Sequence, residues 1–578
     1  MKHSLLSVLC ASLCALPAFG QNINPTVEVT NTYEGNLMEI HKPQQVMALP
    51  DSLMHFNLDF NYSVFESPYK GAYEFKPYAM NMKPQPDAYT GKMLYVRAGA
   101  GYSLHPELTL VYSPQLKGKY QMSVYDNMRS YFGSYRNIQE DLKHTSGTFD
   151  GHDFSNRFGA DGRVDWSKSI LTYDVGFSTI AAKDTLIKHS YNAVDVAARF
   201  RSNNDSEQYF YYDGCLSMSL GKDVFTSHFP SIRNDQNISE NIISFNGSFG
   251  PVMNYVRRIL FDVNMTMAYY GDMLNASVGS MSITPKYQFD KNRWTFSLGG
   301  KISYITKSDD TDMPGNIKMF QNDSQVFYPD IHISYDAIRS YLTLYGYVTG
   351  GDHINTYRSV LSNYHFFNPM ASYGANAMLD NTQEKINFAA GVKGNVATRF
   401  QYDLKAGYAF VDKGMFDKVC RNIMSNGGSG REYCPGVIFA NYKSFYSQLL
   451  FAWNSRNVTV DGDMHYQTTK FEHTENNMFK PSALTGDIRV LYNWNNRIYA
   501  GVNCAFASSR RGYIEKVMTV VPATIPAYTD LGLSAEYQFS RKMSFWVNGG
   551  NLLNQNIQRH PFEPNSGIYF TAGICLNL

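Results

Sequence analysis

The sequence predicts an all-β protein: a transmembrane antiparallel up-and-down β-barrel of about 22 strands, with short periplasmic turns and long extracellular loops. Alternating apolar and polar segments of about 10 to 15 residues recur from about residue 92 to the end of the printed chain. Very short polar turns and longer polar loops join these segments in strict alternation. Aromatic residues make up 15% of the 578 residues and charged residues 17%. After the first twenty residues there is no apolar run of the roughly 18 residues that a membrane helix needs.

Charge and pattern exclude other classes of protein. The formal net charge is +1, so no basic surface is expected and nucleic acid is not an expected partner. A large soluble β-sandwich would also alternate. The long segments and the two-beat rhythm of turns and loops favour the barrel.

The N-terminal part of the chain indicates the compartment. Residues 1–20 have a basic start, an apolar stretch and a small-x-small end, which predicts a secretory signal peptide. Residues 21–91 are expected to be an extended periplasmic or lumenal segment, since prolines recur between Pro25 and Pro77. The barrel is expected over residues 92–578. Together these features predict the outer membrane of a Gram-negative cell.

The connections between segments can be placed from composition. Short turns rich in Asn, Asp and Ser are expected at 113–118, 165–169, 201–206, 249–258, 290–293, 335–340, 396–399, 454–457, 493–497 and 540–542. Long loops are expected at roughly 129–152, 182–189, 222–238, 307–325, 351–384, 413–435, 470–482, 508–527 and 552–566, with two shorter connections near 104–106 and 272–273.

The printed chain ends on a regular alternating segment, "GIYFTAGICLNL". Its apolar face consists of Ile568, Phe570, Ala572, Ile574, Leu576 and Leu578. Backbone groups in lipid must all be paired. We therefore expect this strand to pair with the first one, near "MLYVRAGAGYS", and to close the barrel.

Five cysteines follow the expected signal peptide, and two of them, Cys420 and Cys434, fall in one predicted loop. In an oxidising compartment they could form a disulfide worth about 3 kcal/mol. Two free thiols are an equally open alternative.

No catalytic motif is found, so neither enzymatic activity nor a cofactor is expected. Two loops hold residues that could bind a metal ion. Ordinary solvated loops are the better interpretation, and no metal site is assigned to Asp141, His144, Asp150, His152 and Asp153, or to Asp309, Asp310 and Asp312.

The loop over 356–379 is the longest and most aromatic. Its side chains include Tyr364, His365, Phe366, Phe367 and Tyr373, which water cannot solvate comfortably. Packing against other loops, sealing of the barrel mouth, and recognition of a ligand or partner are the three interpretations.

Two stretches resemble a known family. "WVNGGNLLNQ" (546–555), followed by a loop and the terminal strand, resembles the C-terminal hairpin of TonB-dependent receptors, although the chain ends in Leu578 rather than an aromatic residue. The segment before the barrel resembles that of plugless, receptor-like outer-membrane proteins of Bacteroidota. The matching positions are Tyr33, Pro43, Asp51, Tyr62, Phe75, Lys76 and Pro77.

This resemblance implies a barrel of 22 strands without a full plug domain. It implies nutrient uptake across the outer membrane, with TonB or a surface lipoprotein as partner. The alternative is a plugless structural or accessory subunit of an outer-membrane assembly or secretion complex. Either role implies contact with outer-membrane lipids and insertion by the barrel-assembly machinery.

Overall fold

The computed structural model of the chain describes residues 93–578, except 103, 115, 117–118, 204–208, 228–235, 255–256, 310–323, 370–378, 397–398, 422–432, 473–477 and 517–518. The predicted signal peptide and the predicted extended segment over 21–91 lie outside the described residues, as do Tyr373, Asp310 and Asp312. Predictions for these residues stay predictions.

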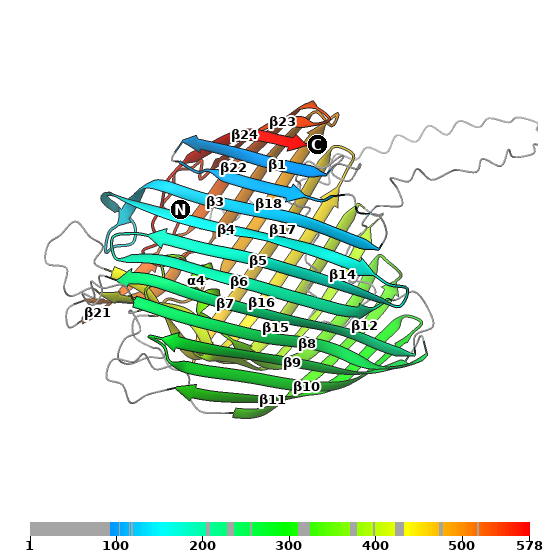
Figure 1. Ribbon diagram of the computed structural model, residues 1–578. Helices are drawn as coiled ribbons and strands as arrows, with labels where there is room; N and C mark the ends of the chain where they lie inside the picture. The colour runs from blue at the N-terminus through cyan, green and yellow to red at the C-terminus, as the bar shows by residue number, and fades with distance from the viewer. Residues whose placement is uncertain are drawn as a thin grey trace, which may run out of the picture. The chain divides into compact units, whose positions relative to one another are not determined.

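The described strands form one closed, fully antiparallel sheet of 22 strands (Figure 1). Each strand pairs with the next along the chain, and β19 pairs with β22. The strands are β1 (Leu94–Tyr102), β2 (Glu107–Tyr112), β3 (Tyr120–Ile138), β4 (Thr145–Asp165), β5 (Ser169–Lys183), β6 (Ile187–Ser202), β7 (Phe210–Ser227), β8 (Gln236–Asn254), β9 (Arg257–Asp272), β10 (Ala276–Lys291), β11 (Trp294–Asp309), β12 (Ser324–Ile338), β13 (Leu342–Ile354), β14 (Asn381–Val396), β15 (Phe400–Arg421), β16 (Tyr433–Asn454), β17 (Val458–Phe471), β18 (Leu484–Trp494), β19 (Ile498–Ala507), β22 (Tyr528–Ser540), β23 (Met543–Gly550) and β24 (Tyr569–Asn577).

The first and last strands close the barrel, as predicted. β1 pairs with β24 from Tyr95 opposite Asn577 to Tyr102 opposite Phe570. Beyond the last ladder pair, the backbones of Leu94 and Leu578 exchange two hydrogen bonds of 2.9 and 2.8 Å. β24 begins at Tyr569, so Ile568 lies just before the strand rather than in it.

Two smaller elements lie outside the barrel sheet. Helix α4 (Tyr357–Asn363) is in the connection between β13 and β14. Strands β20 (Arg510–Lys516) and β21 (Thr519–Ile525) form a separate hairpin between β19 and β22. No helix in the described part of the chain has the length and apolar character needed to cross a bilayer.

The two faces of the wall differ in chemistry. On β7, Leu216, Met218 and Leu220 point outward and are 40–52% exposed. Large apolar side chains are exposed in the same way on most of the other strands. A closed wall with an apolar outer face is the architecture that satisfies every backbone group in lipid. The chain is therefore a membrane-spanning β-barrel.

The inner face carries paired charges. Arg157 and Asp174 form an ion pair of 3.0 Å between β4 and β5, and Lys286 pairs with Asp262 between β10 and β9. The basic groups alone would cost about 2 to 4 kcal/mol each on the lipid side near mid-membrane. Their inward direction confirms the assignment of the polar face to the lumen.

All ten predicted short turns connect the strands they were expected to connect. Several turn residues have left-handed backbones, among them Asn292, Asn495 and Asn496, with φ of 51° to 63°. Asn adopts this conformation more readily than most residues. By the usual orientation of such barrels, this end faces the periplasm and the long-loop end faces outward.

Several expected loops are largely strand, which corrects the sequence prediction, and the one expected over 508–527 contains the β20–β21 hairpin. The loop expected over 129–152 contains the ends of β3 and β4, which leave only 139–144 as connection. Similarly, β15 and β16 extend into the loop expected over 413–435. These segments pair outside the lipid, where neither face needs a continuous apolar stripe, so their composition resembles that of a loop.

Candidate functional site

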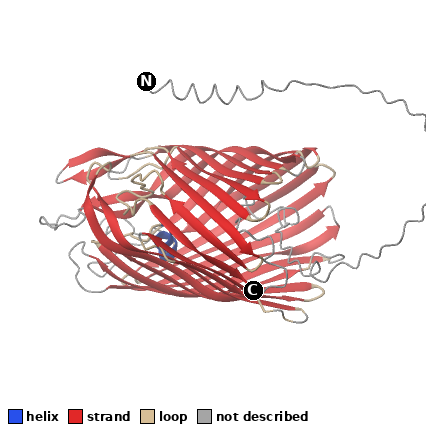
Figure 2. Cartoon of the chain, turned by 90° about the horizontal axis from the view of Figure 1, so that it is seen from above, coloured by secondary structure: helices blue, strands red, loops and turns tan. Residues whose placement is uncertain are grey.

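The described part of the connection between β13 and β14, residues 355–369 and 379–380, folds into the barrel; we call it the inner loop. Helix α4 begins after Thr356, whose hydroxyl accepts the N–H of Ser359 at 3.1 Å as an N-cap. Figure 2 shows α4 within the ring of strands. Tyr357, Val360 and Leu361 are buried against inward-facing residues of the wall. The inner loop therefore occupies part of the lumen on the long-loop side.

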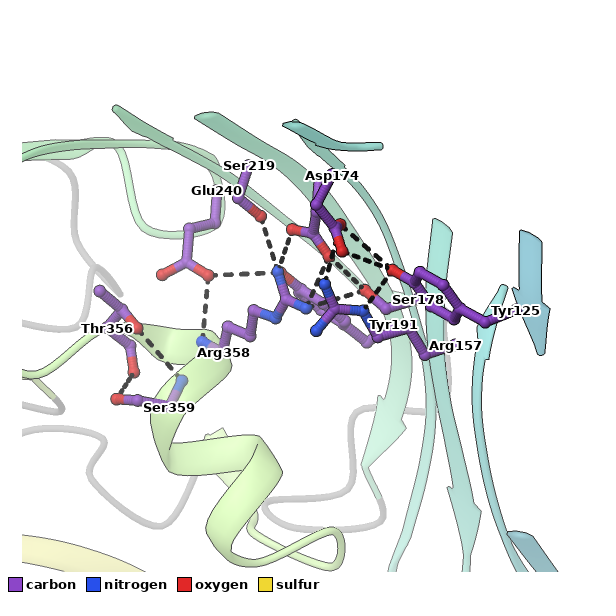
Figure 3. Close-up of polar contacts among 11 residues, drawn as sticks. Tyr125, Arg157, Asp174, Ser178, Tyr191, Ser219, Glu240, Thr356, Arg358 and Ser359 are labelled. Atoms are coloured by element: carbon purple, nitrogen blue, oxygen red, sulfur yellow. Dashed lines mark hydrogen bonds and ion pairs between the residues drawn. The ribbon is translucent and has the colours of Figure 1, made fainter. Parts of the chain in front are cut away.

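Glu240 of β8 holds the start of α4 (Figure 3). Its carboxylate accepts the backbone N–H of Tyr357 at 2.8 Å and that of Arg358 at 3.0 Å. The side chain is 1% exposed. The first N–H groups of a helix have no partner within the helix. A wall carboxylate therefore satisfies two of them with charge-assisted hydrogen bonds.

Arg358 joins α4 to three other strands. Its guanidinium pairs with Asp195 of β6 through both terminal nitrogens. It also donates to the hydroxyl of Ser219 on β7 at 2.8 Å and to that of Ser178 on β5 at 2.9 Å. A bidentate arginine fixes direction as well as position. The helix is thereby tied to one side of the wall.

A second buried network lies beside the first. His189 of β6 and Asp223 of β7 are fully buried and 2.7 Å apart. The other ring nitrogen of His189 lies 2.6 Å from the carbonyl oxygen of Phe367, and the hydroxyl of Tyr357 donates to Asp223 at 2.5 Å. Both ring nitrogens of His189 thus face oxygen acceptors, so the geometry suits the doubly protonated imidazolium.

Four of the five aromatic-loop residues predicted from sequence lie in this region. Tyr364 stacks on His560 at 4.5 Å, and Phe366 meets Tyr135 edge-on at 5.6 Å. Phe367 is completely buried. These contacts are made with the wall and with another loop. They are packing contacts, while sealing of the barrel mouth and ligand recognition stay predictions.

His365 makes a polar contact in the same segment. Its ring nitrogen lies 2.6 Å from the carboxylate of Asp153 on β4. Elsewhere, His144 is hydrogen-bonded to Asp141 within its own loop. Among the described residues, no three His, Cys, Asp or Glu side chains come together as a metal site would require.

A second cluster of loops covers the long-loop end; we call it the outer lid. Its apolar core is formed by Ile138, Leu142, Val419, Tyr433, Phe479, Ile514, Ile525 and Phe562. Asp417 at its edge pairs with Arg510 of the β20–β21 hairpin and with His560, the latter at 2.8 Å. Three separate connections are therefore joined through one carboxylate.

Cys420 and Cys434 lie at the base of this lid. The two residues are directly opposite each other in the β15–β16 ladder. Their backbones are thus adjacent, while the disulfide itself stays a prediction.

The lumenal wall contains a polar cavity of about 840 Å³. It follows strands β7 to β16 and is lined by charged and hydroxyl side chains such as Arg258, Thr284, Lys301, Asp352 and Glu384.

Sequence reasoning did not find the residues that hold the inner loop. Asp195, Asp223 and Glu240 are single acids in separate strands, far from residues 357 and 358 in sequence. The available signal was their place on inward-facing positions, where each acid requires a partner or water. That signal identifies the acids that need a partner, but it does not show which residue the partner is.

These features define a class: a large membrane β-barrel whose lumen is partly filled by its own loops. No protein-family model matches the chain, and no curated protein matches it in sequence. Solved structures share its fold. The FrpB iron transporter from Neisseria meningitidis superposes with a TM-score of 0.63 at 8% identity, covering 84% of this chain and 82% of that one.

Two further structures are similar to the same extent. The ferric-catecholate import receptor Fiu from E. coli K12 has a TM-score of 0.59 at 9% identity, over 84% of this chain and 82% of that one. The siderophore receptor PirA from Acinetobacter baumannii has 0.59 at 10% identity, over 84% and 80%. At this identity the likeness concerns the fold. It agrees with the barrel size that the sequence resemblance implied.

Proposed function

We propose that this chain is an outer-membrane barrel of the TonB-dependent-receptor type that takes up a nutrient through a lumen closed from outside by its own loops. The observation that carries the proposal is the inner loop, held inside the lumen by Glu240 and Arg358. The similar structures support it, since they are an iron transporter, a ferric-catecholate import receptor and a siderophore receptor.

The inner loop is attached to the wall by contacts that could be broken and re-formed, as a gate requires. Its polar contacts with the wall are ion pairs and hydrogen bonds, including those to inward-facing residues of four strands, β5 to β8, rather than a covalent or fully apolar seal. Such contacts can be exchanged for contacts with water or a solute when the lumen is hydrated. TonB, acting through the segment before the barrel, would supply the energy.

Conductance in planar lipid bilayers tests the gate. The full chain is expected to show no large stable conductance. The double variant Glu240→Gln/Arg358→Met is expected to open frequently, because the start of α4 and its link to Asp195 are both lost. Arg199→Met, which breaks the lumenal ion pair with Asp213 toward the short-turn ends of β6 and β7, is the matched control and should stay closed.

Large stable conductance of the unmodified protein would refute a closed lumen. A double variant without conductance would show that the inner loop is not the gate.

A pull-down from native membranes in mild detergent distinguishes uptake from the accessory role. TonB or a surface lipoprotein among the bound proteins supports uptake, whereas assembly or secretion components support the accessory role.

A further inference from the structure

The polar cavity runs obliquely along the inner face of the wall. One row of opposed residues runs from Thr349 through Asp330, Gly299 and Lys286 to Leu260. This row is perpendicular to the strands, and strands in such barrels tilt by about 35–45°. The cavity therefore descends from the upper part of β13–β16 to Tyr211, next to the short-turn end of β7.

The cavity contains buried polar atoms without partners. The hydroxyl of Thr284 and the amide nitrogen of Gln288 have no hydrogen-bond partner in the described part of the chain, and their side chains are 1% and 4% exposed. One carboxylate oxygen of Asp262 and one of Asp352 are also unpartnered there. Buried groups of this kind are stabilised when a ligand or water supplies the missing bond.

The upper end of the cavity is acidic. Asp352 accepts the hydroxyl of Tyr328 at 2.7 Å, and neither it nor Glu384 has an ion-pair partner among the described residues. Lys301 lies nearby and donates to the carbonyl of Gly350 at 2.8 Å. Two carboxylates and one ammonium leave a formal charge of −1 at this end.

The lower end is basic. Arg258 lines it, and the described contacts give its guanidinium no carboxylate partner. The neighbouring acids are already used: Asp213 is held by Arg199 at 2.6 and 2.7 Å, and Asp262 by Lys286. The cavity thus has one uncompensated negative end and one uncompensated positive end.

We propose that this cavity binds a small zwitterionic solute of the size of a short peptide, with its ammonium group toward Asp352 and Glu384 and its carboxylate toward Arg258. The inference rests on the proposed uptake function and specifies its substrate class. A neutral sugar could bond with Thr284 and Gln288 but would leave both charged ends unpaired. A zwitterion satisfies the charges and the buried polar atoms together.

Isothermal titration of the full chain in detergent micelles tests the proposal with three probes. Trialanine with free termini carries both charges. Acetylated trialanine amide has the same backbone without them, and sucrose is a neutral polar solute of similar size. Trialanine is expected to bind, and the capped peptide and sucrose are expected to bind at least about tenfold more weakly.

Two variants locate the site. Asp352→Asn removes one charge at nearly constant volume, and Arg258→Gln replaces the guanidinium with a shorter neutral amide; each should weaken trialanine binding by about tenfold or more. Asp463→Asn is the matched control, since it removes a lumenal carboxylate outside the cavity that bonds with Gln448. Heat-modifiable migration on gels confirms that each variant has folded.

Three results would overturn the proposal: no trialanine binding, equal binding of the capped peptide or sucrose, or unchanged binding by both cavity variants. None of these depends on conductance. If the barrel is gated but does not bind trialanine, this inference is wrong and the proposed function stands. If the barrel binds trialanine but is permanently open, the gated lumen is wrong and this inference stands.

Discussion

Glu240 is buried at 1% exposure although it is formally charged. An isolated carboxylate in such a place would cost several kcal/mol. The two N–H groups at the start of α4, with the neighbouring Arg358, compensate for that cost. The wall and the inner loop therefore depend on each other: without α4, Glu240 would need water, and without Glu240, α4 would begin with unpaired N–H groups.

His560 provides a prediction at the same scale. Burial alone would lower the pKa of His560, but the charge and hydrogen bond of Asp417 outweigh it and raise the pKa. The stabilisation from protonated His560 is fully present below the unfolded pKa and is lost as pH rises through the folded one. The melting temperature should therefore fall more between about pH 6 and pH 9 in the wild type than in His560→Gln.

The measurement is the temperature at which the barrel loses its folded migration on gels, taken at several pH values. His144→Gln is the control, because His144 also lies beside an aspartate but is largely exposed. Equal pH dependence in all three proteins would mean that His560 is not protonated in the folded lid.

Residue-scale prediction from sequence was partial. The aromatic stretch was expected to avoid water, and Tyr364, Phe366 and Phe367 are indeed buried. Their partners were not predictable, because Tyr135 lies on the distant strand β3 and His560 in the connection between β23 and β24. Burial follows from the composition of a segment, whereas a pairing across the lumen depends on where the closed wall places each strand.

At the scale of elements, strands were easier to predict than their ends. Membrane-crossing segments alternate because one face meets lipid. Once β15 and β16 leave the lipid that constraint ends, and "MFDKVC" reads as loop although it is paired. Helix α4 was missed because its seven residues are too few for a periodic pattern. The hairpin of β20 and β21 was included in an expected loop.

The extended β15–β16 ladder sharpens the disulfide prediction. Directly opposed residues of an antiparallel pair have Cα atoms about 4.5–5.5 Å apart, which is within the range of disulfides. We expect Cys420 and Cys434 to be bonded in the oxidised protein, with a contribution of about 3 kcal/mol.

Thiol labelling under denaturing conditions checks this prediction. Cys434 should be protected in the wild type and labelled in Cys420→Ser, with a matching change in non-reducing mobility. Cys504, a free cysteine on β19, supplies the internal standard for labelling. Labelling of Cys434 in the untreated wild type would contradict the bond.

At the scale of the whole molecule, the seam between β1 and β24 is tightly packed around Trp546. Trp546 of β23 is 1% exposed and lies against the glycines of β1 and β24, with the guanidinium of Arg97 at 4.0 Å from its ring. A Cβ atom on Gly99 would overlap the Trp546 ring and come within 2.7 Å of the carbonyl oxygen of Ala572. Glycine is therefore required there for steric reasons.

We predict that Gly99→Val strongly lowers the yield of folded barrel, because overpacking at the seam costs at least about 1–3 kcal/mol. Ala100→Val is the control, since Ala100 is exposed on the lipid side of the same strand. Refolding into detergent, followed by the fraction with heat-modifiable migration, measures both. Equal yields would show that the seam can absorb the extra volume.

The overall architecture was the most predictable level. Strand number, antiparallel order and closure all follow from counting alternating segments between turns, a signal repeated along the chain. The lumen was the least predictable, because what fills it is decided by a few contacts among loops.

The pairing of β1 with β24 also sets the order of folding. Every other pair in the sheet joins strands that are consecutive in sequence or separated only by the short β20–β21 hairpin. Those pairs can form locally, whereas the seam must bring together the two most distant strands against chain entropy. Until then the sheet is open, with two edges whose unpaired backbone can recruit other chains. We therefore expect assembly to have one slow, vulnerable step, during which the two edges stay open to other chains until they meet.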